Sequence, residues 1–132
     1  MEELGPDYPD RAKANHMASP QDILEAMKRP GAVVLDVRTE EEIKEAKLED
    51  LPADVNWAKT GCTRTACPAL ETDPTQFVSD DLSQTIIIYC GSGARASQAK
   101  KTLEAKGYTN VLNGGGLKDM LTYPKLNLSN QL

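Results

Sequence analysis

Two short, uninterrupted apolar runs constrain the fold of this 132-residue chain more than any other feature. Residues 32–35 (Ala-Val-Val-Leu) and 86–89 (Ile-Ile-Ile-Tyr) each have the length of a strand and contain no charged residue. Strands with one face in water alternate apolar and polar residues, whereas continuous apolar strands are typical of parallel sheets covered on both faces. With helical patterns between these runs, we expect an α/β domain with a parallel sheet flanked by helices on both faces.

Capping and periodicity place the helices around these strands. Ser19 and Thr39 each precede an acidic or amphipathic stretch and predict helix N-termini. Residues 95–106 carry small and apolar side chains at helical spacing. We expect residues 108–112 to form a last strand and the glycine run at 114–116 to form a turn.

The length suits one domain, which we assign to residues 18–122. Residues 1–17 are polar and lack an amphipathic period, so we expect a loosely attached leader, with a C-terminal tail at 123–132. No apolar run approaches the roughly 18 to 20 residues that cross a bilayer. The N-terminus also lacks the pattern of a secretory signal, so we expect a cytoplasmic protein. A compartment reached after processing is the alternative.

Charge, histidine and cysteine content exclude several functional classes. Fifteen basic and twenty acidic side chains give a net charge of -5, with no long basic cluster, so we expect neither a nucleic-acid nor a membrane partner. The single histidine, His16, leaves too few ligands for a Cys/His zinc site, and we expect no metal and no cofactor. Three cysteines, an odd count, argue against a fully paired secreted framework.

The segment that follows the second apolar run is the candidate for chemistry. Cys90 ends that run, and small residues and an arginine follow it: Gly91, Ser92, Gly93, Ala94 and Arg95. Glycines allow successive backbone amides to point inward as an anion nest, and the helix beyond adds its positive end. These dipoles favour a Cys90 thiolate, which needs no histidine to act as a nucleophile. The alternative is an inert, buried cysteine before an ordinary turn.

Three segments resemble motifs of the rhodanese, or thiosulfate sulfurtransferase, family. Residues 90–95 are similar to its active-site loop, residues 35–42 to its first-strand signature, and residues 107–116 to its closing strand and glycine turn. The resemblance spans roughly residues 19–121. It implies a rhodanese-like five-stranded parallel sheet flanked by helices on both faces. It also implies transfer of a sulfane sulfur through a Cys90 persulfide, from a donor such as thiosulfate to a thiol or cyanide acceptor.

The resemblance also suggests roles for residues around Cys90. Arg95 either clamps an anionic substrate or holds the loop closed. Asp36 and Arg38 match positions that brace the site, with a simple surface ion pair as the alternative. The related tyrosine phosphatases keep one more residue between cysteine and arginine. The four residues present here favour a sulfur atom over a phosphate.

The chain departs from the family pattern in two places. Residues 46–57 lack the usual Gly-His-Ile segment, which leaves substrate choice open. The usual tryptophan after the glycines is missing, and we expect Met120 or Leu121 to fill its space. In the next loop, Cys62 and Cys67 act as resolving thiols, form a reversible disulfide with each other, or have no redox role.

The sequence therefore predicts a single-domain sulfurtransferase that is a monomer or a weak dimer. Its expected partners are a small sulfur donor and a thiol or cyanide acceptor, or else a thioredoxin-like or sulfur-carrier protein. Two alternatives stay open. One is a sulfur carrier or protein-binding module without turnover, and the other is a thiol-redox protein that uses Cys62 and Cys67.

Overall fold

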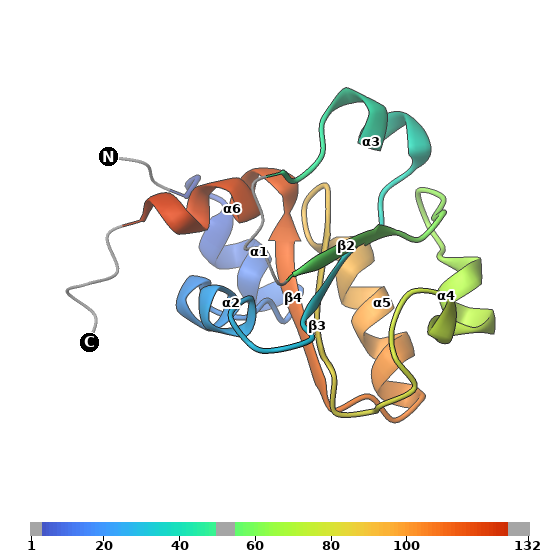
Figure 1. Cartoon of the computed structure of the whole chain (residues 1–132). Helices are drawn as coiled ribbons and strands as arrows, with labels where there is room; N and C mark the ends of the chain where they lie inside the picture. Colours follow the sequence, from blue (N-terminus) through green and yellow to red (C-terminus); the bar gives the residue numbers. More distant parts are fainter. Residues whose placement is uncertain (1–3, 50–54, 127–132) are drawn as a thin grey trace.

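A computed structural model describes residues 4–49 and 55–126 of the chain. Figure 1 shows the elements, which follow one another in this order: α1 (Tyr8–Ala14), α2 (Pro20–Ala26), β1 (Val33–Asp36), α3 (Glu40–Glu45), β2 (Asn56–Lys59), α4 (Pro68–Thr72), the 3-10 turn η1 (Pro74–Gln76), β3 (Thr85–Cys90), α5 (Ala94–Ala105), β4 (Asn110–Gly116), α6 (Leu117–Thr122) and the 3-10 turn η2 (Tyr123–Lys125).

The sheet is parallel throughout, with strand order β2-β1-β3-β4. The expectation of five strands is wrong for the described residues, which contribute four. Beside β4, Met17 makes one isolated parallel bridge with Asn113. Met17 lies between the end of α1 and Pro20, where α2 begins, so the chain has no room there for a longer extended run.

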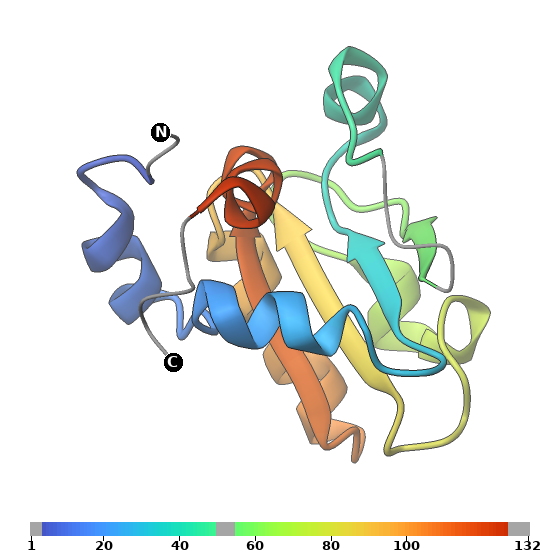
Figure 2. The same cartoon turned by 60° about the vertical axis from the view of Figure 1, so that its left-hand side comes forward.

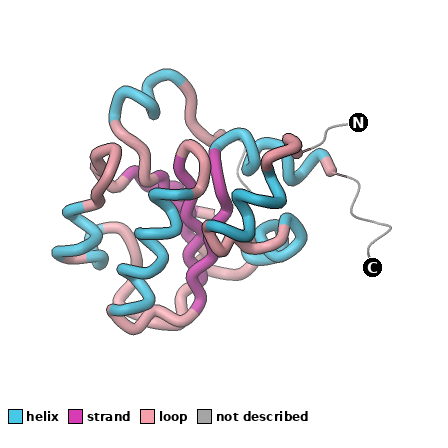
Figure 3. Tube along the Cα trace, turned by 180° about the vertical axis from the view of Figure 1, so that it is seen from behind, coloured by secondary structure: helices cyan, strands magenta, loops and turns pink. Residues whose placement is uncertain are grey.

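Side chains of β3 alternate between two cores, as expected for a strand covered on both faces. Ile86, Ile88 and Cys90 pack in the cluster that includes Leu70 of α4 and residues of α5. Ile87 and Tyr89 pack in the other cluster, with residues of α2 and α6. Figure 2 shows α2, in blue, across one face and α5, in orange, behind the other, and helices also surround the strands in the view from behind (Figure 3). The predicted α/β arrangement is therefore confirmed.

Both predicted helix N-termini are confirmed. The Ser19 Oγ accepts a hydrogen bond from the backbone N–H of Asp22 at 3.1 Å. Thr39 and Glu42 form a reciprocal capping box at the start of α3. These bonds satisfy N–H groups that a helix start otherwise leaves without partners.

The glycine run belongs to β4 instead of forming the predicted turn. The pairing of β3 with β4 shifts register between Ile88 and Tyr89, and Gly115 adopts a φ of 89°, which favours glycine. This irregularity places Gly116 opposite Cys90. Met120 is buried under the glycines, whereas Leu121 is exposed, so Met120 fills the interior position.

The N-terminal segment is more closely attached than its polar composition predicts. Residues 8–14 form α1, and the ring of Tyr8 packs edge-on against that of Tyr123, with centroids 6.3 Å apart. Among the described residues, no helix is both long enough and apolar enough to span a bilayer. The extreme ends assigned to the leader and the tail, residues 1–3 and 127–132, lie outside the described residues.

Candidate functional site

Cys90 lies at the carboxyl end of a central strand, and two backbone amides point at its sulfur. The Sγ accepts hydrogen bonds from the N–H of Gly93 at 3.0 Å and from the N–H of Ala96 at 3.4 Å. Ala96 lies in the first turn of α5, whose cap residue Gly93 offers no side-chain acceptor. The sulfur therefore accepts bonds from amides that helical bonding leaves free, in the manner of a capping oxygen.

The loop after Cys90 is closely held against β4. Gly93 has a φ of 110°, a conformation that side-chain-bearing residues rarely adopt. Asn113 Nδ2 donates to the Gly93 carbonyl at 3.0 Å, and Asn113 Oδ1 accepts from Gly115 N at 2.8 Å. A Cβ on Gly116 would collide with the backbone carbonyl of Gly91. The loop geometry therefore depends on glycine in two segments that are distant in sequence.

Cys90 itself is almost fully buried, with 1% of its surface exposed. Gly91 and Ser92 are exposed, and they border a hollow of about 270 Å³. Cys90 is a free thiol. Cys90 therefore differs from an inert cysteine buried among apolar groups alone. Its two amide donors would compensate a negative charge on the sulfur.

Arg95 is engaged by a carboxylate instead of pointing free into the loop. Its Nη1 and Nη2 donate to the two carboxylate oxygens of Glu42, at 2.9 and 3.0 Å. The bonds from Arg95 are the main reason that the pKa of Glu42 falls to about 2. Because Glu42 also caps α3, the pair joins the start of α3 to the first turn of α5. This geometry matches a loop-holding role more closely than a substrate clamp.

Asp36 and Arg38 form a buried pair at the carboxyl end of β1. Arg38 donates from Nε and Nη2 to the two oxygens of Asp36, at 2.9 and 2.8 Å, and both residues are buried. Tyr89 Oη donates to Asp36 Oδ2 at 2.7 Å. Burial raises the pKa of Tyr89 to about 12, so this hydroxyl stays a donor. The surface-pair alternative is therefore wrong.

Cys62 and Cys67 are joined to each other in a disulfide. Both are buried in the same cluster as Cys90. Cys67 and Arg95 line one hollow on the side of α5. The bond places the two sulfurs as a pair separate from Cys90, and a redox role for them stays a prediction.

Sequence reasoning missed several residues that hold the loop. Glu42 lies in the acidic stretch after Thr39, and its spacing from Thr39 is the one signal that places a carboxylate at a fixed position there. Asn113, Arg11 and Asp119 gave no comparable signal, because the bonds of Asn113 and Arg11 to the loop, and of Asp119 to Arg11, join residues far apart in the chain. Within residues 4–49 and 55–126, no three His, Cys, Asp or Glu side chains are grouped as metal ligands would be.

Comparison with known proteins finds a relative of this chain. The thiosulfate sulfurtransferase PspE of Escherichia coli (strain K12) is 46% identical over 46 residues, which are 35% of this chain and 43% of that protein. The match therefore spans less than half the length of that relative.

Solved structures share the fold over longer segments. A rhodanese with anions from E. coli is 26% identical, with a TM-score of 0.54 over 67% of this chain and 89% of that one. An uncharacterized protein from Saccharomyces cerevisiae is also 26% identical, with a TM-score of 0.58 over 85% of this chain and 97% of that one. A human single-domain sulfurtransferase, at 20% identity and a TM-score of 0.56 over 80% and 94%, shows the fold alone.

A family model matches most of the chain, including β3, β4 and α5, which build the Cys90 site. It describes the rhodanese-like domain and covers residues 19–120. The three resembling motifs, the parallel sheet and the cysteine loop at its edge all lie in this segment. The chain therefore belongs to the rhodanese-like domain family.

Proposed function

We propose that this chain is a sulfurtransferase in which Cys90 carries the transferred sulfur. The observation that carries the proposal is the pair of N–H groups, from Gly93 and Ala96, directed at the sulfur of a free cysteine. Hydrogen bonds to the charged form of an acid favour that form, so this arrangement supports a thiolate nucleophile. Membership of the rhodanese-like family supports sulfur chemistry at such a thiolate.

The proposed reaction has two displacement steps. The Cys90 thiolate attacks the outer sulfur of thiosulfate, a new S–S bond forms, and sulfite leaves with the electron pair of the broken S–S bond. Cyanide or a thiolate then attacks the outer sulfur of the Cys90 persulfide. Thiocyanate or a new persulfide forms, and the Cys90 thiolate returns. Neither step needs an oxidant, and the amides of Gly93 and Ala96 stabilise the Cys90 thiolate that begins the first step and that the second step restores.

The exposed backbone of Gly91 and Ser92 provides the proposed approach for the donor. These two residues are exposed, whereas Cys90 is buried. A loop with four residues between cysteine and arginine is short, so it favours a single sulfur atom over a tetrahedral phosphate group. We therefore propose a small sulfane-sulfur donor and a thiol or cyanide acceptor.

Incubation with thiosulfate and cyanide tests the proposal directly. We expect the full chain to form thiocyanate and the Cys90→Ser variant to form none above background. Intact mass after thiosulfate alone should show one added sulfur, which cyanide removes and the Cys90→Ser variant never gains. A variant with both Cys62→Ser and Cys67→Ser is the matched control, and it should keep the added sulfur.

The other outcomes either contradict the proposal or point to a different function. Thiocyanate formation at the wild-type rate by Cys90→Ser contradicts the proposal. Added sulfur without turnover indicates a sulfur carrier that depends on a protein partner. Loss of the added sulfur in the Cys62→Ser, Cys67→Ser control instead indicates thiol-redox chemistry at that disulfide.

A further inference from the structure

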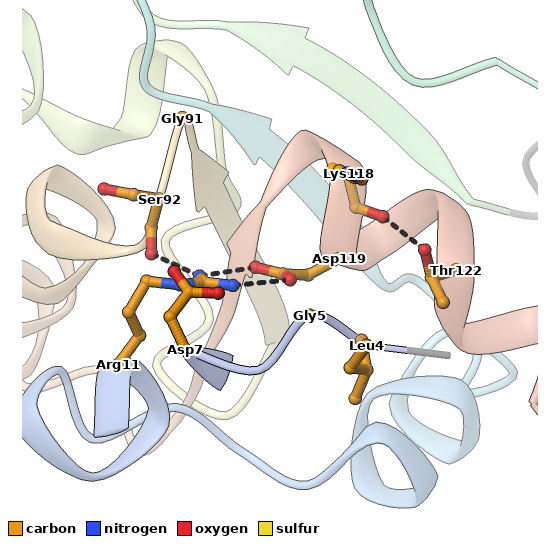
Figure 4. Close-up of a pocket in the computed structure, with 9 residues that line it drawn as sticks. All are labelled: Leu4, Gly5, Asp7, Arg11, Gly91, Ser92, Lys118, Asp119 and Thr122. Carbon is orange, nitrogen blue, oxygen red and sulfur yellow. Dashed lines mark hydrogen bonds and ion pairs between the residues drawn. The ribbon is translucent and has the colours of Figure 1, made fainter. Parts of the chain in front are cut away.

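The side chain of Arg11, which lies outside the family match, donates to the Cys90 loop. Arg11 belongs to α1, and the match covers residues 19–120. Its Nη1 donates to the carbonyl of Ser92 at 2.8 Å. Its Nη1 and Nη2 donate to the carboxylate of Asp119, at 2.8 and 2.9 Å. Figure 4 shows the guanidinium between the loop and α6, so one side chain joins three segments.

The carbonyl that Arg11 holds shares a peptide unit with an amide that contacts the sulfur. The Gly93 N–H donates to Cys90 Sγ at 3.0 Å, and this N–H belongs to the same peptide as the Ser92 carbonyl. In a planar trans peptide, the C=O and the N–H point in opposite directions. A side chain that fixes the carbonyl therefore also fixes the N–H.

We propose that Arg11 is a positioning residue for the Cys90 thiolate: it holds the Ser92–Gly93 peptide with its N–H directed at the sulfur. The importance of Arg11 for turnover rests on the proposed function, in which Cys90 carries the transferred sulfur. The geometry of Arg11 is independent of which sulfur donor the protein uses.

The orientation of the Ser92–Gly93 peptide depends on a contact from outside the loop, because Gly93 itself restricts it little. Gly93 has no Cβ, and glycine accepts conformations that let the preceding peptide rotate at little cost. After such a rotation the Ser92 carbonyl oxygen, with its partial negative charge, would face the sulfur. The cationic guanidinium prevents this and also polarises the peptide, which strengthens its N–H as a donor.

Arg11 is itself held in place by a buried carboxylate. Asp119 is 5% exposed, and its Oδ2 also accepts a bond from Gly116 N at 2.8 Å. The bonds from Asp119 raise the pKa of Arg11, so the guanidinium stays charged. Asp7 accepts a bond from Arg11 Nε at 2.9 Å, but its side chain is 68% exposed. Asp119 is therefore the partner that fixes the orientation of Arg11.

Other charges around the loop must be separated from the effect of Arg11. Near the end of β1 and the first turn of α5, two pairs already bind their charges to each other, Asp36 with Arg38 and Glu42 with Arg95. Beside Arg11 lie Asp7, Lys118 and Asp119. Removing Arg11 alone leaves the buried carboxylate of Asp119 without its cationic partner, which disfavours a thiolate by charge alone. The double variant Arg11→Met with Asp119→Asn removes one charge of each sign and still deletes the bond to Ser92.

The pH profile of Cys90 alkylation by iodoacetamide tests the proposal in the full chain without reductant. Cys90 is the free thiol, since Cys62 and Cys67 are paired. For Arg11→Met and for the double variant, we expect the midpoint to rise by about one pH unit. Alkylation below the midpoint should then be about tenfold slower. Asp7→Asn removes only the exposed partner of Arg11 and should leave the profile unchanged.

Two results overturn the proposal. One is a wild-type profile in a folded Arg11→Met variant. The other is a shift in Arg11→Met that disappears in the double variant, which would assign the effect to charge alone. Thermal unfolding verifies that each variant folds. If Arg11→Met does not fold, Arg11→Lys keeps the charge and loses the planar fork, and it should shift the midpoint in the same direction by less.

The experiment also separates this inference from the proposed function. Alkylation reports the state of the thiol without any sulfur donor. A shifted profile in a protein that forms no thiocyanate would support the role of Arg11 and contradict only the proposed turnover.

Discussion

Two arginine–carboxylate pairs hold the Cys90 loop, and they act on different parts of it. Arg95 with Glu42 fixes the first turn of α5 against α3, and both residues lie within the family match. Arg11 with Asp119 fixes one peptide of the loop from α1, which lies outside that match. The difference shows that the helix end and the peptide orientation are secured separately around the same sulfur.

Removing Arg95 should give the larger loss of activity. Arg95→Met leaves the first turn of α5 without its tie to α3, so the amides of both Gly93 and Ala96 lose their alignment with the sulfur. We expect thiocyanate formation to fall about 100-fold, against about 10-fold for Arg11→Met, where one amide is affected. Lys100→Met removes an exposed ion pair with Glu104 on the same helix and should change the rate little. Equal losses for the two arginine variants would contradict the division of roles.

For stability, the order of the two pairs should be reversed: loss of Asp119, the partner of Arg11, should destabilise the protein more than loss of Glu42, the partner of Arg95. Asp119→Asn weakens the bonds to Arg11 and Gly116 N at a side chain that is 6% exposed, and we expect the free energy of unfolding to fall by about 2 kcal/mol. The Glu42 side chain is 20% exposed, so solvent screens its pair with Arg95 more. Glu42→Gln should cost about 1 kcal/mol. Urea denaturation of both variants measures the order, and a larger loss for Glu42→Gln would reverse it.

Acid should weaken the pair with Glu42 within a defined range of pH. The pKa of Glu42 is lowered from 4.5 to about 2, so the folded state binds the proton less tightly than the unfolded chain. This contribution to stability is complete above pH 4.5 and is lost as the pH falls towards 2. The difference in unfolding free energy between wild type and Glu42→Gln should therefore be constant at neutral pH and shrink over this range. A difference that persists at pH 2 would contradict the assignment.

The exposed partner of Arg11 should matter least. Asp7 forms an ion pair with Arg11 but its side chain is 68% exposed, so solvent screens the pair. We expect Asp7→Asn to change the thermal midpoint by no more than the scatter of repeated measurements. A clear loss of stability would instead show that the attachment of α1 depends on Asp7 as well as on Asp119.

Local signals in the sequence were enough to predict the strands and the cysteine loop. The apolar runs correspond to β1 and β3, Ser19 and Thr39 begin helices, and Cys90 ends its strand as expected. Each of these features depends on residues close in sequence, where periodicity and capping are informative.

Features that depend on distant contacts were missed. The glycine run was predicted as a turn because glycine usually marks one, yet pairing with β3 extends the strand through it. The segment with α1 was predicted to be loose because its polar residues show no apolar face, whereas Arg11 attaches it through Asp119, 108 residues away. The fifth strand came from the family pattern, and the described residues form four strands and one isolated bridge, between Met17 and Asn113.

The close approach of Gly116 to the Gly91 carbonyl has a consequence for how such a protein can diversify. Backbone meets backbone there, so no rotamer change could make room for even a methyl group at position 116. Gly91 and Ser92 have exposed surface, but a side chain at position 116 would push directly against the segment that follows Cys90. The activity that remains after Gly116→Ala therefore measures how far Cys90 can be displaced before the proposed sulfur transfer fails.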